Sequence, residues 1–190
     1  MEQNDALALF RRAGAYLEGH FRLSSGLHST GSMQSALVLQ HPADAAALGS
    51  ALAARLSSLK ADAVLAPALG GIIIGHEVAR ALGVRSLFAE RAAPALVLRR
   101  GFALAPGERV VVVEDVFTTG GSTRETMDVA RTAGAEVVGV AAIVDRSGGT
   151  IDFGVPAQSL IAISLPTYDP AQCPLCAQGV PVVKPGSRPG

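Results

Sequence analysis

The stretch "RVVVVEDVFTTGGSTRE", residues 109–125, decides the fold. Its four consecutive valines predict a strand that is buried on both faces, as in a parallel sheet covered by helices. Glu114 and Asp115 follow the valines, and a Gly-Gly-Ser-Thr run then opens a segment of helical character that closes at Gly134. In such a strand–turn–helix unit the turn lies at the carboxyl edge of the sheet, where open α/β sheets bind ligands.

The same alternation of apolar strands and helices extends over residues 60–165. "DAVLAPALGG", "VRSLFAE" and "EVVGVAAIVD" read as strands, and "IIIGHEVARALG" reads as a helix. We therefore predict one α/β domain, residues 1–190, with a doubly wound, mostly parallel sheet in its core. Residues 1–40 and the C-terminal tail are expected to form a small hood over one edge of that sheet.

The N-terminal part offers three local signals. Residues 4–18 predict a helix with Asn4 as its cap and Gly19 as its stop. The Gly- and Ser-rich segment "GHFRLSSGLHSTGSMQ" interrupts helical periodicity and predicts a hairpin or loop. His41-Pro42 then opens a second helix with Pro at its start and a stripe of leucines along one side.

Composition excludes several classes of protein. The chain has 190 residues, of which 49% are hydrophobic and 17% charged, which fits a folded domain with a sizeable core. Sixteen basic and sixteen acidic residues give a net charge of zero, so nothing indicates the positive field of a general nucleic-acid binder. No apolar run approaches the roughly 20 residues of a membrane span, and the N-terminus lacks the layout of a secretory signal. We expect a cytoplasmic protein that binds neither nucleic acid nor membrane.

The turn after the valine strand has the chemistry of a phosphate site. Glycines let an anion approach the backbone, hydroxyls donate hydrogen bonds, and the first N–H groups of a helix are unpaired. The residues of this turn are Thr118, Thr119, Gly120, Gly121, Ser122 and Thr123. The adjoining Glu114 and Asp115 can accept hydrogen bonds from a vicinal diol and can lie near a magnesium ion. A ribose 5-phosphate meets both demands, whereas the plain alternative is a capped turn with two solvated acids.

The string "VVVVEDVFTTGGST" resembles the signature with which type I phosphoribosyltransferases bind phosphoribosyl pyrophosphate (PRPP). The resemblance implies that Glu114 and Asp115 hold the ribose hydroxyls, and that Mg²⁺ arrives mainly with PRPP near these two acids, without a certain protein ligand. "APALGGIIIGHEVA" resembles the loop that receives the pyrophosphate in this superfamily. It implies pyrophosphate contacts from Leu69, Gly70 and Gly71, and a strained peptide between Ala68 and Leu69.

Two further segments resemble the orotate phosphoribosyltransferase family in particular. "EGHFRLSSGLHSTGSMQ" is similar to the hood segment that covers the pyrimidine, and "VVGVAAIVDRSGG" places Arg146 where that family has the arginine for the orotate carboxylate. An arginine fork suits a planar carboxylate. The resemblance implies an enzyme that transfers phosphoribosyl from PRPP to orotate, with Arg146, Thr119 and Ser24 at the orotate, and a homodimer. The alternatives are a purine or uracil phosphoribosyltransferase and a non-catalytic regulator that senses PRPP or nucleotide.

One segment departs from that family's pattern. Many of its members carry a mobile loop, rich in Lys and with a His, that comes from the partner subunit. The matching segment "AERAAPALVLRRGF" has neither Lys nor His. We expect Arg91 to reach the pyrophosphate and, with Asp115, to act in catalysis, while Arg99 and Arg100 are expected to be strand residues. The sequence leaves the turnover rate open.

The two cysteines form the pair Cys173-Pro-Leu-Cys176. Such a pair reads as half a zinc site or as a redox pair, but tetrahedral zinc needs four ligands, and the sequence offers no second CxxC and no His pair close by. Two pairs could meet across a dimer, and two ordinary thiols in the tail are the simpler interpretation. Among the four histidines only His28, inside the hood segment, stands out as a candidate for a functional role.

Overall fold

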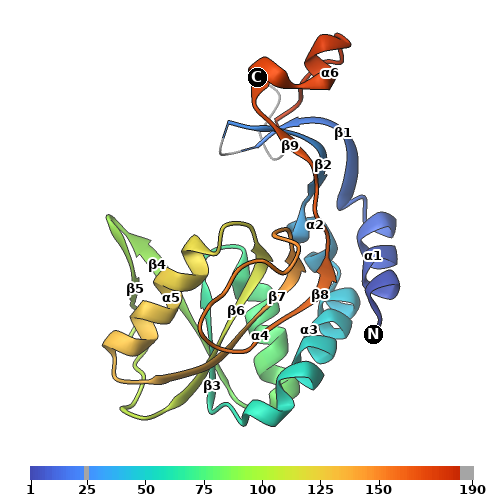
Figure 1. Ribbon diagram of the computed structural model, residues 1–190. Coiled ribbons are helices and arrows are strands. Elements are labelled where there is room, and N and C mark those ends of the chain that lie inside the picture. Colours follow the sequence, from blue (N-terminus) through green and yellow to red (C-terminus); the bar gives the residue numbers. More distant parts are fainter. Residues whose placement is uncertain (24–25, 185–190) are drawn as a thin grey trace.

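The structure is a computed structural model that describes residues 1–23 and 26–184. Its centre is a six-stranded sheet with the order β5-β4-β3-β6-β7-β8 (Figure 1). The strands are β3 (Ala63–Pro67), β4 (Arg85–Ala92), β5 (Ala95–Leu98), β6 (Arg109–Phe117), β7 (Glu136–Asp145) and β8 (Ala157–Ala162). Every neighbouring pair is parallel except β4 and β5. The predicted doubly wound, mostly parallel sheet is confirmed.

Helices cover both faces of this sheet (Figure 1). The helices are α1 (Gln3–Arg12), α2 (Ser35–Leu39), α3 (Pro42–Leu56), the 3₁₀ turn η1 (Ser57–Leu59), α4 (Gly71–Leu82) and α5 (Gly121–Thr132). Val111 and Val113 of β6 belong to the core on the side of α3 and α4, whereas Val110 and Val112 belong to the core on the side of α5. Successive side chains of a strand point to opposite faces, which explains why the valine run is continuous.

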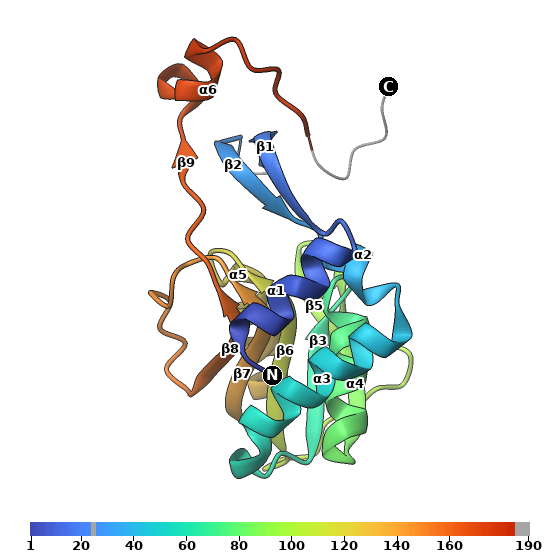
Figure 2. The ribbon, with the colours of Figure 1, turned by 90° about the vertical axis from the view of Figure 1, so that its right-hand side faces the viewer.

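A three-stranded antiparallel sheet forms the hood above the carboxyl edge of the large sheet. Its order is β1-β2-β9, and it contains β1 (Tyr16–Arg22), β2 (His28–Met33) and β9 (Thr167–Tyr168). Two short turns follow, η2 (Pro170–Gln172) and α6 (Pro174–Ala177). The chain then returns, and Val183 pairs with Phe21 on the other edge of the hairpin. The tail therefore flanks the β1–β2 hairpin on both sides (Figure 2).

Two expectations for the N-terminal part were wrong. The first helix ends at Arg12, because Gly14 takes a left-handed conformation and β1 begins at Tyr16; its cap is Glu2, not Asn4. The hood is also smaller than residues 1–40, since Phe10 of α1 is fully buried in the core of the large sheet. The predicted start of the next helix at Pro42 is confirmed, but α3 packs on the sheet and so belongs to the core.

Among the described residues, no helix combines the length and the apolar character that crossing a bilayer requires.

Candidate active site

Glu114 and Asp115 lie at the carboxyl end of β6, and they differ in environment. Glu114 is 5% exposed, and its two carboxylate oxygens accept hydrogen bonds from the Ser122 hydroxyl at 2.8 Å and the Asp115 N–H at 3.2 Å. Burial, and then the charge of Asp115, raise the pKa of Glu114 to about 8. Asp115 is only half-buried. Asp115 is therefore the more accessible of the two carboxylates, while Glu114 ties the strand to the start of α5.

The turn between β6 and α5 presents donors to the space above the sheet. Thr118 and Thr119 are exposed, and Gly120 takes the N-cap position of α5 with φ of 77° and no side-chain cap. The first N–H groups of the helix therefore remain available to an anion. A Cβ on Gly120 would lie 2.9 Å from a ring atom of Phe153, so the turn is pressed against that ring.

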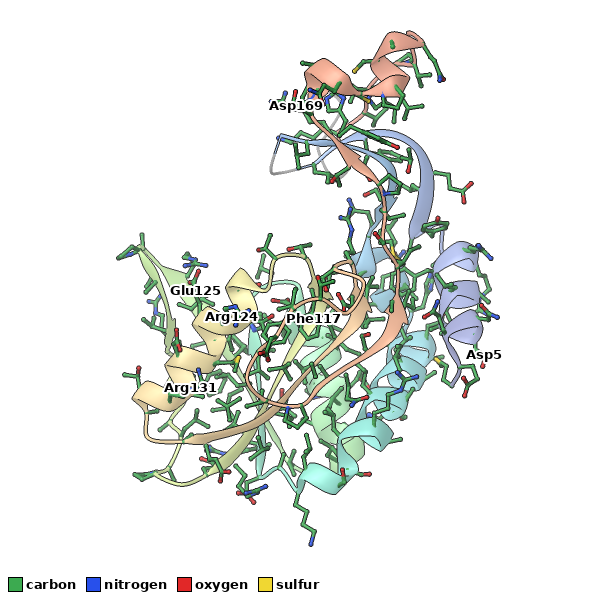
Figure 3. The ribbon with its side chains drawn as sticks, in the orientation of Figure 1. Asp5, Phe117, Arg124, Glu125, Arg131 and Asp169 are labelled. Carbon is green, nitrogen blue, oxygen red and sulfur yellow. The ribbon has the colours of Figure 1, made fainter. Side chains whose placement is uncertain are left out.

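Aromatic side chains support this turn, and Figure 3 labels Phe117 and Arg124 beside it. Phe117 at the end of β6 lies with its ring centre 4.9 Å from that of Phe153. The guanidinium carbon of Arg124 in α5 also lies over the Phe153 ring, 5.1 Å from its centre, and Arg124 donates to the Asp152 carbonyl. These contacts fix the backbone of the turn before any ligand arrives.

The loop between β3 and α4 approaches the same place. A Cβ on Gly70 would lie 2.8 Å from an Asp115 carboxylate oxygen, and one on Gly71 would lie 3.0 Å from the Val113 carbonyl. The peptide between Ala68 and Leu69 is cis, at the position where the resemblance led us to expect an unusual peptide. Leu69 is 85% exposed. The two loops that the sequence assigned to ribose phosphate and to pyrophosphate are thus neighbours across Asp115.

A cavity of about 660 Å³ lies between the sheet edge and the hood. Its lining comes from the turn, the hood, and the segments after β7 and β8: Leu23, Leu27, Thr118, Thr119, Arg146, Ser164, Leu165 and Thr167. Sequence reasoning named both threonines and Arg146. It missed the other five; only Leu23 and Leu27 carried a signal, because they belong to the hood segment.

Among the described residues, Arg146 is the one guanidinium that lines this cavity. Its Nε atom is buried, and within the described residues it has no hydrogen-bond partner. Burial lowers the pKa of Arg146. The preceding Asp145 accepts hydrogen bonds from the Ser147 N–H and hydroxyl and from the Gly149 N–H, which holds the loop that carries Arg146. A buried donor without an acceptor at a cavity wall suits an anionic ligand.

Other predicted site residues lie in less suitable places. The Ser122 hydroxyl is bonded to Glu114, and Thr123 is buried, so both can offer a ligand only backbone N–H groups. A Cβ on Gly121 would lie 3.6 Å from the Thr119 hydroxyl oxygen, an ordinary van der Waals distance. Ser24 lies outside the described residues.

Arg91 projects from β4, and within this chain its guanidinium bonds to Glu125 of α5 at 2.5 Å and to the Pro94 carbonyl at 3.1 Å (Figure 3). These bonds direct it to α5, so the structure does not bring it together with the residues at the β6 edge. The expectation that Arg99 and Arg100 are strand residues was wrong, because β5 ends at Leu98. Arg100 lies in the turn after β5 and forms an ion pair with Glu90 of β4.

A second cavity, of about 470 Å³, lies between β5 and α5. It is lined by aliphatic side chains together with Glu125 and Asp128. Two acids and no basic side chain in its lining make it unsuitable for phosphates or carboxylates. The cavity with Arg146 is therefore the candidate active site.

Comparison with known proteins agrees with this geometry. The phosphoribosyl transferase domain family matches residues 35–153, which is more than half of the chain. The chain therefore belongs to the phosphoribosyltransferases. An orotate phosphoribosyltransferase of Pelotomaculum thermopropionicum is 53% identical over 188 residues, covering 99% of this chain and 99% of that protein. Another, of Carboxydothermus hydrogenoformans, is 54% identical over 186 residues, covering 97% of each. Within the class, the chain belongs to the orotate phosphoribosyltransferase family.

The fold has solved counterparts as well. The crystal structure of the Mycobacterium tuberculosis orotate phosphoribosyltransferase superimposes with a TM-score of 0.70, at 24% identity, and the match covers 84% of this chain and 95% of that chain. At this level of identity the likeness shows the fold.

The sequence shows no His pair near Cys173 and Cys176, but the folded chain provides one. The structure brings Cys173 and Cys176 together with two histidines, His20 of β1 and His28 of β2. The two histidines are eight positions apart and lie far from the cysteines in the sequence. Their spacing therefore gave no sign that they belong with the CxxC pair. The pairing of the hairpin with the tail is what joins the four side chains.

Proposed function

We propose that this protein transfers the 5-phosphoribosyl group from PRPP to orotate, giving orotidine 5′-monophosphate and pyrophosphate in pyrimidine biosynthesis. The observation that carries the base specificity is the buried Arg146 Nε, which has no acceptor in the part of the chain that the structure describes and lies at a cavity that Thr118 and Thr119 also line. Its guanidinium can bind the carboxylate that distinguishes orotate from uracil and from the purine bases.

The geometry suggests how both substrates lie. The 5-phosphate would occupy the turn of residues 118–123, the ribose hydroxyls would meet Asp115, and the pyrophosphate would face the loop of residues 69–71. The orotate ring would lie under the hood with its carboxylate on Arg146. Its ring nitrogen then forms a bond to C1 of the ribose and releases its proton to solvent, while the bond from C1 to the pyrophosphate oxygen breaks and pyrophosphate leaves with the bonding electron pair. Holding the two reactants in line and excluding water are the contributions we assign to the chain.

Magnesium fits this site as a companion of PRPP. Mg²⁺ prefers carboxylate and phosphate oxygens and keeps several waters. The half-buried Asp115 can supply such an oxygen, whereas Glu114, with its pKa raised to about 8, is a poorer donor near neutral pH. We therefore propose that Mg²⁺ binds mainly to PRPP and approaches the protein at Asp115, where it would stabilise negative charge on the leaving pyrophosphate.

We further propose a cytoplasmic homodimer. The resemblance of residues 89–102 to a loop that a partner subunit supplies supports the dimer. Light scattering of the purified protein measures the oligomeric state directly. A monomer at the concentrations used in the activity assay would contradict the proposal.

The activity is tested by offering PRPP and Mg²⁺ with orotate, uracil, hypoxanthine, xanthine or adenine, and measuring pyrophosphate release. We expect pyrophosphate release with orotate and with none of the other four bases. Release only with a purine or with uracil would identify that base as the substrate. Release with none of the five would exclude the enzymatic activity and favour a regulator that senses PRPP.

Substitution of Arg146 tests the carboxylate contact. A charge-assisted hydrogen bond contributes about 1.5–3 kcal/mol, so Arg146→Ala should raise the KM for orotate by roughly 10- to 100-fold while the KM for PRPP changes little. Arg131→Ala is the control, because Arg131 lies in the last turn of α5 and pairs only with Asp128 on the surface. Equal effects of Arg146→Ala on both substrates would indicate a structural role instead.

A further inference from the structure

Four potential metal ligands converge in the hood, outside the cavity described above. They are His20, His28, Cys173 and Cys176, and their ligand atoms all lie within 4.8 Å of one another. The cluster joins β1 and β2 to the segment that contains η2 and α6, which lies at the top of the molecule, where Figure 3 labels Asp169. Its members are His20, His28 and Cys173, which are buried, and Cys176, which is exposed.

The distances between these atoms resemble the edges of a tetrahedral zinc site. Zn–S bonds of about 2.3 Å and Zn–N bonds of about 2.05 Å imply S···N edges of about 3.6 Å and an N···N edge of about 3.3 Å. The Cys176 sulfur lies 3.7 Å from His20 Nε2 and 3.3 Å from His28 Nδ1, and the Cys173 sulfur lies 3.4 Å from His20 Nε2. Of these four distances, the N···N distance, at 2.8 Å, needs the largest change, a widening of about half an ångström.

The second nitrogen of His20 is already arranged for a metal ligand. His20 Nδ1 lies 2.8 Å from the Val180 carbonyl oxygen, which can only accept a hydrogen bond. That contact places the proton on Nδ1 and leaves the Nε2 lone pair directed at the two sulfurs and His28. A backbone carbonyl that orients a ligating histidine in this way is a regular feature of zinc sites.

Apolar burial contributes little to holding the short turns beside the cluster. Neither η2 nor α6 contains a buried residue. The buried Cys173 lies between them. Segments of three and four residues cannot be held by apolar burial of their own. Small units of this kind are commonly held by a metal or by disulfides. A hydrogen bond between the two imidazoles explains their contact but not the convergence of both sulfurs on the same nitrogens.

We propose that His20, His28, Cys173 and Cys176 form a structural zinc site that fastens the C-terminal tail to the β1–β2 hairpin. The site is closed, with four protein ligands and no position for a substrate. On binding, the two thiols release their protons to solvent and both imidazoles bind as neutral rings, so no oxidant or reductant takes part.

Metal analysis of the full chain tests the proposal. The protein is produced without a polyhistidine tag, purified without chelators and analysed by plasma mass spectrometry. We expect about one zinc ion per chain. Exchange for Co²⁺ should give the visible bands of tetrahedral cobalt together with the near-ultraviolet absorption of cobalt–thiolate bonds, which report both the geometry and the sulfur ligands.

Matched substitutions locate the metal. Cys176→Ser and His28→Ala should each lower the bound zinc by about tenfold or more and abolish the cobalt–thiolate spectrum or weaken it. His76→Ala is the control, because His76 is an exposed histidine of α4 outside the cluster, and it should retain the metal content of the unsubstituted chain. If the cluster variants do not fold, the wild-type cobalt spectrum still decides the question.

Three results would overturn the proposal. One is a wild-type chain that binds neither zinc nor cobalt when either ion is supplied during expression. Another is a disulfide between Cys173 and Cys176 in protein purified anaerobically, because that bond would consume both sulfur ligands. Equal loss of metal in His76→Ala and in Cys176→Ser would place the metal elsewhere and would also overturn it.

A consequence for substrate binding rests on the proposed function. Leu23 and Leu27 of the hairpin and Thr167 of β9 line the cavity, and the cluster joins these two parts of the hood. Removing the metal with a chelator should therefore raise the KM for orotate several-fold more than the KM for PRPP. A chain that contains zinc but does not use orotate would disprove the activity and leave the metal site intact.

Discussion

Glu114→Gln removes a buried titratable group and keeps its size and one acceptor oxygen. In the folded chain, burial and then the charge of Asp115 raise the pKa of Glu114 from 4.5 to about 8. Between these two pH values the folded chain keeps a proton on Glu114 that the unfolded chain has released. The free energy of unfolding must therefore fall as pH rises through this window. Above it, both states are ionised, and the folded state bears the whole cost of a buried carboxylate.

The magnitude follows from the two pKa values. Their difference, 8 minus 4.5, is 3.5 units, and each unit corresponds to about 1.36 kcal/mol, which gives about 5 kcal/mol as an upper value. The hydroxyl of Ser122 already donates to Glu114 at 2.8 Å and can support the ionised form. We therefore expect a loss of about 2–5 kcal/mol in wild-type stability between about pH 5 and pH 9 from this group.

Urea unfolding at a series of pH values measures this effect. The stability of Glu114→Gln relative to the wild type should increase with pH by about 2–5 kcal/mol, because the variant has no proton to lose at this position while all other groups contribute equally to both proteins. Glu18→Gln is the control, since Glu18 is exposed on β1 and its substitution removes no buried carboxyl group. Parallel curves for the wild type and Glu114→Gln would refute the reasoning.

Three further substitutions test the sheet edge. Gly70→Ala would place a methyl group 2.8 Å from an Asp115 oxygen, so calorimetric titration should show PRPP binding at least tenfold weaker, by about 1.4 kcal/mol; unchanged affinity would contradict the close approach of the two loops. Asp115→Asn should weaken binding of magnesium-PRPP and shift the Mg²⁺ concentration needed for activity upward, and identical Mg²⁺ curves would exclude the proposed contact. Gly120→Ala meets both the left-handed φ of 77° and the Phe153 ring at 2.9 Å, so thermal unfolding should show a loss of more than about 1 kcal/mol, and wild-type stability would be inconsistent with a rigid turn.

The sheet and the β6 turn were predictable because their signals are local. The valines of residues 110–113 indicate a strand buried on both faces, and Gly120 and Gly121 mark the turn into α5 within a few positions. The end of α1 was not predictable in the same way, because apolar spacing continues past Arg12 to Leu17, and only pairing of β1 with β2 makes Tyr16 and Leu17 strand residues. Tertiary pairing overrides helical periodicity at such a boundary.

The roles of individual side chains in the turn needed coordinates. The sequence predicts Ser122, Thr123 and Thr118 equally as hydroxyl donors to a phosphate. In the structure the Ser122 hydroxyl is bonded to Glu114, and Thr123 is buried. Which hydroxyl points outward depends on the phase of the helix relative to the sheet below it, and no local pattern contains that information. The His20–Cys173 contact, between residues 153 positions apart, is beyond local patterns for the same reason.

The two walls of the cavity are held by different means, and this should separate the behaviour of the two substrates. The wall proposed to bind PRPP stands on β6 and on the Phe117–Phe153 pair, which are parts of the buried core. The wall proposed to bind orotate is the hood, whose short turns η2 and α6 bury no side chain. Local opening is easiest where few apolar contacts resist it. Under the proposed function, we therefore expect the hood to open and admit orotate while the other wall keeps its shape, so that PRPP binds first and orotate second.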